Sequence, residues 1–63
     1  MIVREGDRLT EARLGWREGP RGRMTPTVHD GTREVARERV EILAATDDQR
    51  EALALAGWRV VAK

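Results

Sequence analysis

Few side chains in this sequence of 63 residues are of the types that carry out catalysis. The chain has no Ser and no Cys, so it offers no serine or thiolate nucleophile, and its hydroxyl groups all belong to threonine. His29 is the sole imidazole, and with Asp30 it makes the one adjacent acid–base pair. Asp30 is explained more simply as a turn residue, because Gly31 follows it. The sequence therefore predicts a protein that is not an enzyme.

Metal and cofactor sites are not expected either. Zinc sites are built from Cys and His, and one His with no Cys cannot supply them. Asp47, Asp48 and Glu51 lack the alternating ligands and the glycine of a calcium loop, and acidic side chains are common in the first turn of a helix. The Gly-rich stretch 15–22 has no Gly-Lys-Ser/Thr sequence, so it is not a phosphate-binding loop. We predict no metal, no cofactor and no small-molecule substrate.

The residues best suited to binding are three arginines beside a tryptophan. Residues 17–23 read Arg-Glu-Gly-Pro-Arg-Gly-Arg, which predicts an exposed loop. Guanidinium groups bind phosphates and carboxylates, and Trp16 can stack on a base, so Arg17, Arg21 and Arg23 form a candidate nucleic-acid contact. The net charge of +1 argues against nucleic acid as the main partner. Docking to a protein, or plain solvation of the loop, is the favoured interpretation.

Charge is also distributed in blocks along the chain. Residues 1–29 sum to +2, residues 30–51 to −3 and residues 52–63 to +2, which together give the net +1. Opposite blocks of this kind suit head-to-tail self-association or docking to a charged partner. A mixed, solvated surface is the simpler alternative. The acidic run adds Glu34, Glu38 and Glu41 to the candidate partner-binding residues.

The chain is short for a stable domain. Val, Ile and Leu number 13 and there is no Phe, so the apolar core must be small. A domain of about 60 residues buries only about 60% of the surface of its unfolded chain and usually relies on a cross-link or a partner. Disulfides are excluded by composition, so oligomerisation or docking remains. Trp16 and Trp58, the only aromatic residues, are expected mainly in the core, with an interface anchor as the alternative role.

The first half of the chain predicts strands. Residues 1–4 form a short strand before a turn at 5–7, and residues 8–17 alternate in a second strand that turns Leu14 and Trp16 inward. A helix is the competing interpretation of residues 8–17, because Leu9, Ala12, Arg13 and Trp16 also share a helical face, but Gly15 and the following Gly19-Pro20 disfavour it. Residues 24–29 form a third strand, in which Pro26 indicates a sheet edge. The pair Asp30-Gly31 then predicts a hairpin into residues 32–35, because both residue types tolerate positive φ.

The second half predicts a strand, a helix and a strand. Residues 32–44 fit either a helix or a strand, with strand favoured for 39–44 by Val40 and Ile42. Thr46 and Gln49 form a capping box that starts a helix over residues 47–56, and Gly57 ends it. A last strand follows from Val60 to residue 63, and strands on both sides of the helix would pair in parallel.

Two resemblances can be stated on these residues. The opening Val3-Arg4-Glu5-Gly6-Asp7, the strand that ends at Gly15-Trp16, the Gly-rich loop and the hairpin after Met24 resemble SH3-like small barrels, including the KOW type of ribosomal and transcription proteins. The C-terminal pattern Thr46-x-x-Gln49-x-x-Ala52-Leu53, followed by Gly57-Trp58-x-Val60-Val61, resembles the closing helix and strand of small phage or prophage head-associated proteins. The second resemblance implies a subunit that binds a capsid or tail shell in many copies.

Together these observations predict one α+β domain over residues 1–63, with a mainly antiparallel sheet, an SH3-like barrel as one form of it, and one C-terminal helix. The expected function is that of a non-enzymatic structural or interaction protein, such as an accessory subunit of a phage particle or another protein assembly. The alternative is a small nucleic-acid-binding or regulatory protein. No membrane segment is expected, and the expected location is the cytoplasm or a virus particle assembled there. The candidate partner-binding residues are Trp16, Arg17, Arg21, Arg23, Thr25, Thr27, Val28, Glu34, Glu38 and Glu41, with residues 25–28 expected as a free sheet edge.

Overall fold

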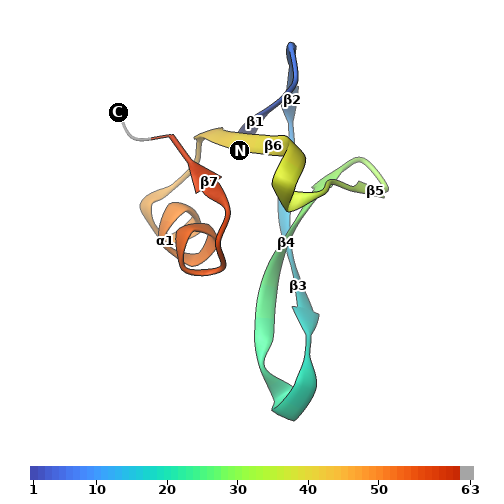
Figure 1. Cartoon of the computed structure of the whole chain (residues 1–63), viewed down its shortest axis with the longest axis vertical. Coiled ribbons are helices and arrows are strands. Elements are labelled where there is room, and N and C mark those ends of the chain that lie inside the picture. The colour runs from blue at the N-terminus through green and yellow to red at the C-terminus, as the bar shows by residue number, and fades with distance from the viewer. Residues whose placement is uncertain (62–63) are drawn as a thin grey trace.

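A computed structural model, which describes residues 1–61, has seven strands in two open sheets and one α-helix beside them (Figure 1). The elements in chain order are β1 (Ile2–Glu5), β2 (Arg8–Glu11), β3 (Arg13–Glu18), η1 (Pro20–Gly22), β4 (Met24–Asp30), β5 (Arg33–Glu34), η2 (Arg37–Arg39), β6 (Val40–Ala44), α1 (Asp47–Leu55) and β7 (Arg59–Val60). One sheet has the strand order β2-β1-β6-β7 and the other β3-β4-β5. The predicted α+β class with mostly antiparallel strands is confirmed. The sheets do not close, so the SH3-like barrel is not confirmed.

The predicted second strand over residues 8–17 is two strands in different sheets. The strand is interrupted at Ala12, which is buried in the core and donates its N–H to the Met1 carbonyl at 2.8 Å. β2 pairs with β1, whereas β3 pairs with β4. An alternating pattern continues through such a break because side chains keep changing sides when the strand changes partner. The pattern therefore predicted the strands but not the boundary between the sheets.

Residues 32–44 form strands and one short 3-10 turn rather than an α-helix. β5 pairs with the end of β4, η2 forms a single turn, and β6 pairs with β1. The predicted strand over residues 39–44 is confirmed as Val40–Ala44. The predicted hairpin is also confirmed, but the two turn residues are Gly31 and Thr32, and Asp30 is the last residue of β4, opposite Arg33. Gly31 has φ of +65°, which favours glycine there.

The helix begins at Asp47 as predicted and ends at Leu55, one residue before the predicted end. The Thr46 hydroxyl accepts the Gln49 N–H at 3.2 Å, and the Gln49 side chain accepts the Thr46 N–H at 2.9 Å, so the capping box is complete. Gly57, with φ of +90°, follows the last turn. The Trp58 N–H then donates to the Leu53 carbonyl at 2.9 Å.

The segment from β6 to β7 has the predicted strand–helix–strand order with parallel strands. Glu41 lies opposite Arg59 and Ile42 opposite Val60. The Val61 N–H donates to the Ile42 carbonyl at 2.9 Å, which extends the pairing by one bond. The predicted end of this strand at residues 62–63 lies outside the described residues.

The core is small and lies between the two sheets and α1. Its buried apolar members are Val3, Ala12, Val28, Val35, Val40, Ile42, Leu53 and Trp58. Trp58 is 9% exposed, so its predicted core position is confirmed. The core position predicted for Trp16 is wrong, because its side chain is 52% exposed. Trp16 lies on the part of the β3–β4 hairpin that extends beyond the core.

Candidate interaction site

The β3–β4 hairpin projects from the rest of the molecule, along its 37 Å long axis (Figure 1). Residues directly opposite each other in an antiparallel pair share a face. The pairs on one face are Leu14 with Val28, Trp16 with Pro26, and Glu18 with Met24. The pairs on the other face are Arg13 with His29, Gly15 with Thr27, and Arg17 with Thr25. The hairpin therefore has one mainly apolar face and one polar face.

The apolar face continues from the core to the projecting end. Val28 is fully buried and Pro26 is buried, whereas Trp16 and Met24 are each 52% exposed. Leu55, at the end of α1, is 84% exposed. Together they border a groove of about 350 Å³ between the hairpin and the helix, lined by Trp16, Arg23, Met24, Thr25, Pro26, Ala52, Leu55 and Ala56. We call this surface the apolar groove.

The polar face of the hairpin is closed around Gly15. The His29 Nε2 and Thr27 Oγ1 atoms lie 2.8 Å apart and share a hydrogen bond directly over this residue. A Cβ atom at Gly15 would lie 2.9 Å from each of these two atoms. Glycine is therefore needed for close approach here, and the His29 ring serves the packing of the hairpin.

The two edges of the hairpin differ in their free backbone groups. The Gly19 N–H donates to the Arg23 carbonyl at 2.6 Å, which makes this the first hydrogen-bonded pair of the hairpin. Because such pairs alternate along an antiparallel ladder, every second residue of β3 turns its N–H and C=O outward, and these residues are Leu14, Trp16 and Glu18. The corresponding residues of β4 are Met24, Pro26 and Val28. Pro26 has no N–H, and the Val28 carbonyl already accepts the Val35 N–H at 2.9 Å.

The predicted basic loop is shorter than expected. Arg17 and Glu18 belong to β3, and only Pro20–Gly22 forms the 3-10 turn at the tip. The Arg17 guanidinium donates to the Glu34 carboxylate of β5, so this charge is already paired. Arg21 and Arg23 remain exposed at the tip, and Arg23 also borders the apolar groove. Arg23 shares one hollow with Arg17 and another with Arg21.

The sheet edge predicted at residues 25–28 is only partly accessible. Thr25 is exposed, and its hydroxyl donates to the Arg17 carbonyl at 3.3 Å. Thr27 is 6% exposed and Val28 is fully buried, so these two side chains are not part of the surface. The exposed apolar side chains of the hairpin are instead Trp16 and Met24.

The acidic candidates are dispersed over the surface. Glu34 pairs with Arg17, and Glu41 pairs with Arg4 and with Arg59. The hydrogen bond from Arg4 lowers the pKa of the Glu41 carboxyl from its ordinary value of 4.5. Glu38 lines a shallow hollow of about 390 Å³, whose other charged lining residues are Arg4, Arg37, Arg39, Glu41 and Arg59. Since Arg4 and Arg59 are paired and Arg37 donates to the Ala56 carbonyl at 3.0 Å, much of the positive charge of this hollow is satisfied within the chain.

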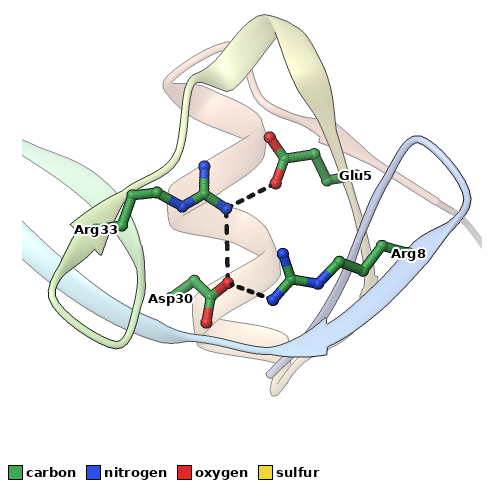
Figure 2. A network of polar contacts seen from close by, with 4 residues as sticks. All are labelled: Glu5, Arg8, Asp30 and Arg33. Carbon is green, nitrogen blue, oxygen red and sulfur yellow. Dashed lines mark hydrogen bonds and ion pairs between the residues drawn. The ribbon is translucent and has the colours of Figure 1, made fainter.

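A polar network holds the base of the hairpin against the first sheet. Figure 2 shows Arg33 between the carboxylates of Glu5 and Asp30, at 2.8 and 3.5 Å, with Arg8 on the other side of Asp30 at 3.4 Å. Glu5 and Arg8 come from β1 and β2, whereas Asp30 and Arg33 come from β4 and β5. The hydrogen bond from Arg33 lowers the pKa of Glu5, and the same bond raises the pKa of Arg33. The network therefore links the two sheets and helps to fix the direction of the hairpin.

Within residues 1–61 no three acidic or histidine side chains are grouped closely enough to hold a metal ion. None of the helices described there is long and apolar enough to cross a membrane.

The sequence pointed to several residues of this site and missed others. Trp16, Arg23 and Thr25 were named, but Met24, Pro26, Ala52, Leu55 and Ala56 were not named as binding residues. Leu55 carried a usable signal, because it lies off the helix face formed by Ala52, Leu53 and Ala56. Nothing local indicated that Met24 would lie near Leu55, since the two are far apart in the chain.

Comparisons with protein-family models, with curated proteins and with solved structures find no significant match to this chain.

Proposed function

We propose that this protein is a non-enzymatic interaction protein, a small subunit of a larger protein assembly, which binds a protein partner through the apolar groove. The observation that carries the proposal is the exposure of Trp16, Met24 and Leu55 around one groove. Contiguous apolar surface bordered by polar residues marks interaction sites in soluble proteins. The phage particle implied by the resemblance is one assembly in which such a subunit would be repeated in many copies.

The apolar side chains supply enough free energy to matter. A Trp side chain buries roughly 200 Å² when it is fully covered, and Trp16 retains 52% of its exposure. Covering the remaining area of about 100 Å² corresponds to about 2.5 kcal/mol at about 25 cal/mol per Å². A contribution of that size is typical of an energetic hot spot. Trp16 is therefore the anchor of the proposed interface.

The charge around the groove selects the chemistry of the partner. Arg23 lines the groove, and at the tip it shares a second hollow with Arg21. A partner segment that inserts an apolar side chain and carries carboxylates beside it would match both features. We therefore propose an apolar segment of a second protein, flanked by Asp or Glu, as the occupant.

The nucleic-acid alternative is less well supported. It requires Arg17, Arg21 and Arg23 to act together on phosphates, but Arg17 is engaged with Glu34. Two free guanidinium groups at a hairpin tip give weak binding that salt would abolish.

Affinity capture with matched variants tests the proposal. The tagged protein is used to capture partners from a lysate of its own host, with and without nuclease, and each captured protein is then purified and titrated in solution. We expect a protein partner that nuclease does not remove, and we expect Met24→Lys to weaken its binding at least tenfold. Leu9→Lys is the control, because Leu9 is 62% exposed on β2 and lies outside the groove.

Two results would contradict the proposal. Equal binding of a partner by the wild type and by Met24→Lys would exclude the apolar groove. Capture that disappears with nuclease, together with binding that decreases steeply with salt, would favour the nucleic-acid alternative.

A further inference from the structure

β3 is an edge strand of the three-stranded sheet, and a further strand can pair with its outer edge. Within residues 1–61 β3 pairs only with β4, and the sheet order is β3-β4-β5. The outward N–H and C=O groups belong to Leu14, Trp16 and Glu18, and the backbone hydrogen bonds found outside the ladders of residues 1–61 involve none of them. An edge of this kind is a template for pairing with another chain.

We infer that β3 pairs with β3 of a second copy of this chain, antiparallel and about a two-fold axis at Trp16. This inference rests on the proposed function, because it takes the same hairpin as the interaction surface. It assigns the free edge of β3 to a second copy, which contacts one side of Trp16, and it leaves the part of the apolar groove beside Met24 and Leu55 to the protein partner.

The register follows from the alternation of the backbone groups. A two-fold axis at Trp16 places this residue opposite its own copy and places Leu14 opposite Glu18 of the second copy. All of these residues turn their N–H and C=O outward, so each opposite pair can exchange two hydrogen bonds. In a register shifted by one residue, residues with outward N–H and C=O groups would lie opposite residues whose groups already bond to β4. The apolar faces of the two hairpins would then lie on opposite sides of the joined sheet.

The side chains also fit this register. On the apolar face the two Trp16 rings become cross-strand neighbours, a pairing that stabilises sheets. On the polar face Arg17 lies opposite Gly15 of the second copy, and Arg13 lies opposite Gly19. No like charges are directly opposite, so the register contains no repulsive pair at those positions.

The strand β4 does not offer an equivalent edge. Pro26, at the centre of the outer edge of β4, has no N–H to donate, and the Val28 carbonyl already accepts a hydrogen bond from the Val35 N–H. Thr25 and Thr27 of β4 also line a hollow together with Arg37 and Glu38 of η2. Pairing through β3 would leave both apolar grooves on the same side of a joined sheet, where a partner assembly can reach them together.

Sedimentation equilibrium and amide hydrogen exchange test the inference. The wild type is expected to reach twice its 7.1 kDa chain mass as concentration rises. In the dimer the amides of Leu14, Trp16 and Glu18 are expected to become protected as concentration rises. The amides of Arg13 and Arg17 bond to β4 and are expected to be protected at every concentration.

Two variants separate the inference from the proposed function. Trp16→Lys places two charges across the axis and is expected to raise the dimer dissociation constant at least tenfold. Met24→Lys is the matched control, because Met24 has the same exposure as Trp16 but lies on β4, away from the axis. It should dimerise like the wild type while losing the protein partner.

Each alternative outcome is decisive. A wild type that is monomeric up to millimolar concentration, or a dimer in which the amides of Leu14, Trp16 and Glu18 exchange rapidly, overturns the inference. In that case a partner that Met24→Lys fails to bind leaves the proposed function standing. A dimer that Trp16→Lys dissociates and Met24→Lys does not supports the inference even where no partner is captured, and the failure then belongs to the proposed function alone.

Discussion

The close approach at Gly15 makes a quantitative prediction about the hairpin that presents Trp16. In Gly15→Ala the new methyl group would lie 2.9 Å from His29 Nε2 and from Thr27 Oγ1, well inside the ordinary contact distance of about 3.5 Å. At least one of these side chains must move, which breaks their hydrogen bond. The bond contributes about 1 kcal/mol, and overpacking of this kind costs at least about 1 kcal/mol.

The lower chain entropy of alanine in the unfolded state offsets about 0.5 kcal/mol of this cost. The net expectation is that Gly15→Ala lowers the free energy of unfolding by about 1–2 kcal/mol, or the melting temperature by roughly 5–15 °C in a domain of this size. Urea and thermal unfolding followed by circular dichroism measure both quantities. Gly19→Ala is the control, because Gly19 has φ of −104° and the nearest atom to its added Cβ is the Arg23 carbonyl oxygen at 3.4 Å. We expect the control to change stability by less than about 0.5 kcal/mol.

A double-mutant cycle identifies the atoms responsible. If the His29 ring is the obstacle, the cost of Gly15→Ala should decrease by about 0.5–1 kcal/mol when it is made in a His29→Ala background. A Gly15→Ala variant as stable as the wild type would refute the reasoning. An equal cost in both backgrounds would show that the ring does not restrict the site.

Two further predictions concern the helix and the ion pairs. Thr46→Ala removes the hydroxyl that accepts the Gln49 N–H and should cost about 1 kcal/mol in urea unfolding, and an unchanged unfolding midpoint would show that the cap is dispensable. The lowered pKa values of Glu5 and Glu41 mean that their ion pairs stabilise the fold above about pH 4.5 and that this stabilisation is lost as pH falls through the lower folded pKa. Between pH 6 and 8 these two groups should leave the stability unchanged. From pH 5 to pH 3 the urea unfolding midpoint should fall less in Arg33→Gln than in the wild type. An equal fall in both proteins would contradict the role of Glu5.

Local signals made the second half of the chain predictable. The capping box at Thr46 and the glycine after α1 each specify a backbone conformation within a few residues, and Gly31 does the same for the hairpin that precedes this half. The helix, the parallel strands around it and the hairpin followed from these signals. The position of Trp58 was predictable for the same reason, because a residue just past the helix cap returns toward the helix.

Non-local geometry limited what could be predicted about the site. Alternation assigned Trp16 correctly to the same side as Leu14, but it carries no information on whether another element covers that side. Leu14 lies near the core, whereas Trp16 lies beyond its edge. The ion pair between Arg17 and Glu34 could not be predicted for the same reason, because it forms only where β5 lies beside the hairpin.

The length of the hairpin is the strongest structural argument for an interaction role. Its base contributes Val28 to the core and is fixed by the network around Arg33, so the fold is already anchored there. The projecting half adds Trp16 and Met24, which contribute little to the core of a chain that has 13 Val, Ile and Leu residues and no Phe. A chain this poor in large apolar side chains would gain stability by burying both of its tryptophans, but it buries only Trp58. The projecting half of the β3–β4 hairpin instead holds Trp16 at the surface, beside the unpaired edge of β3. This arrangement supports the proposal that a partner covers the Trp16 side chain.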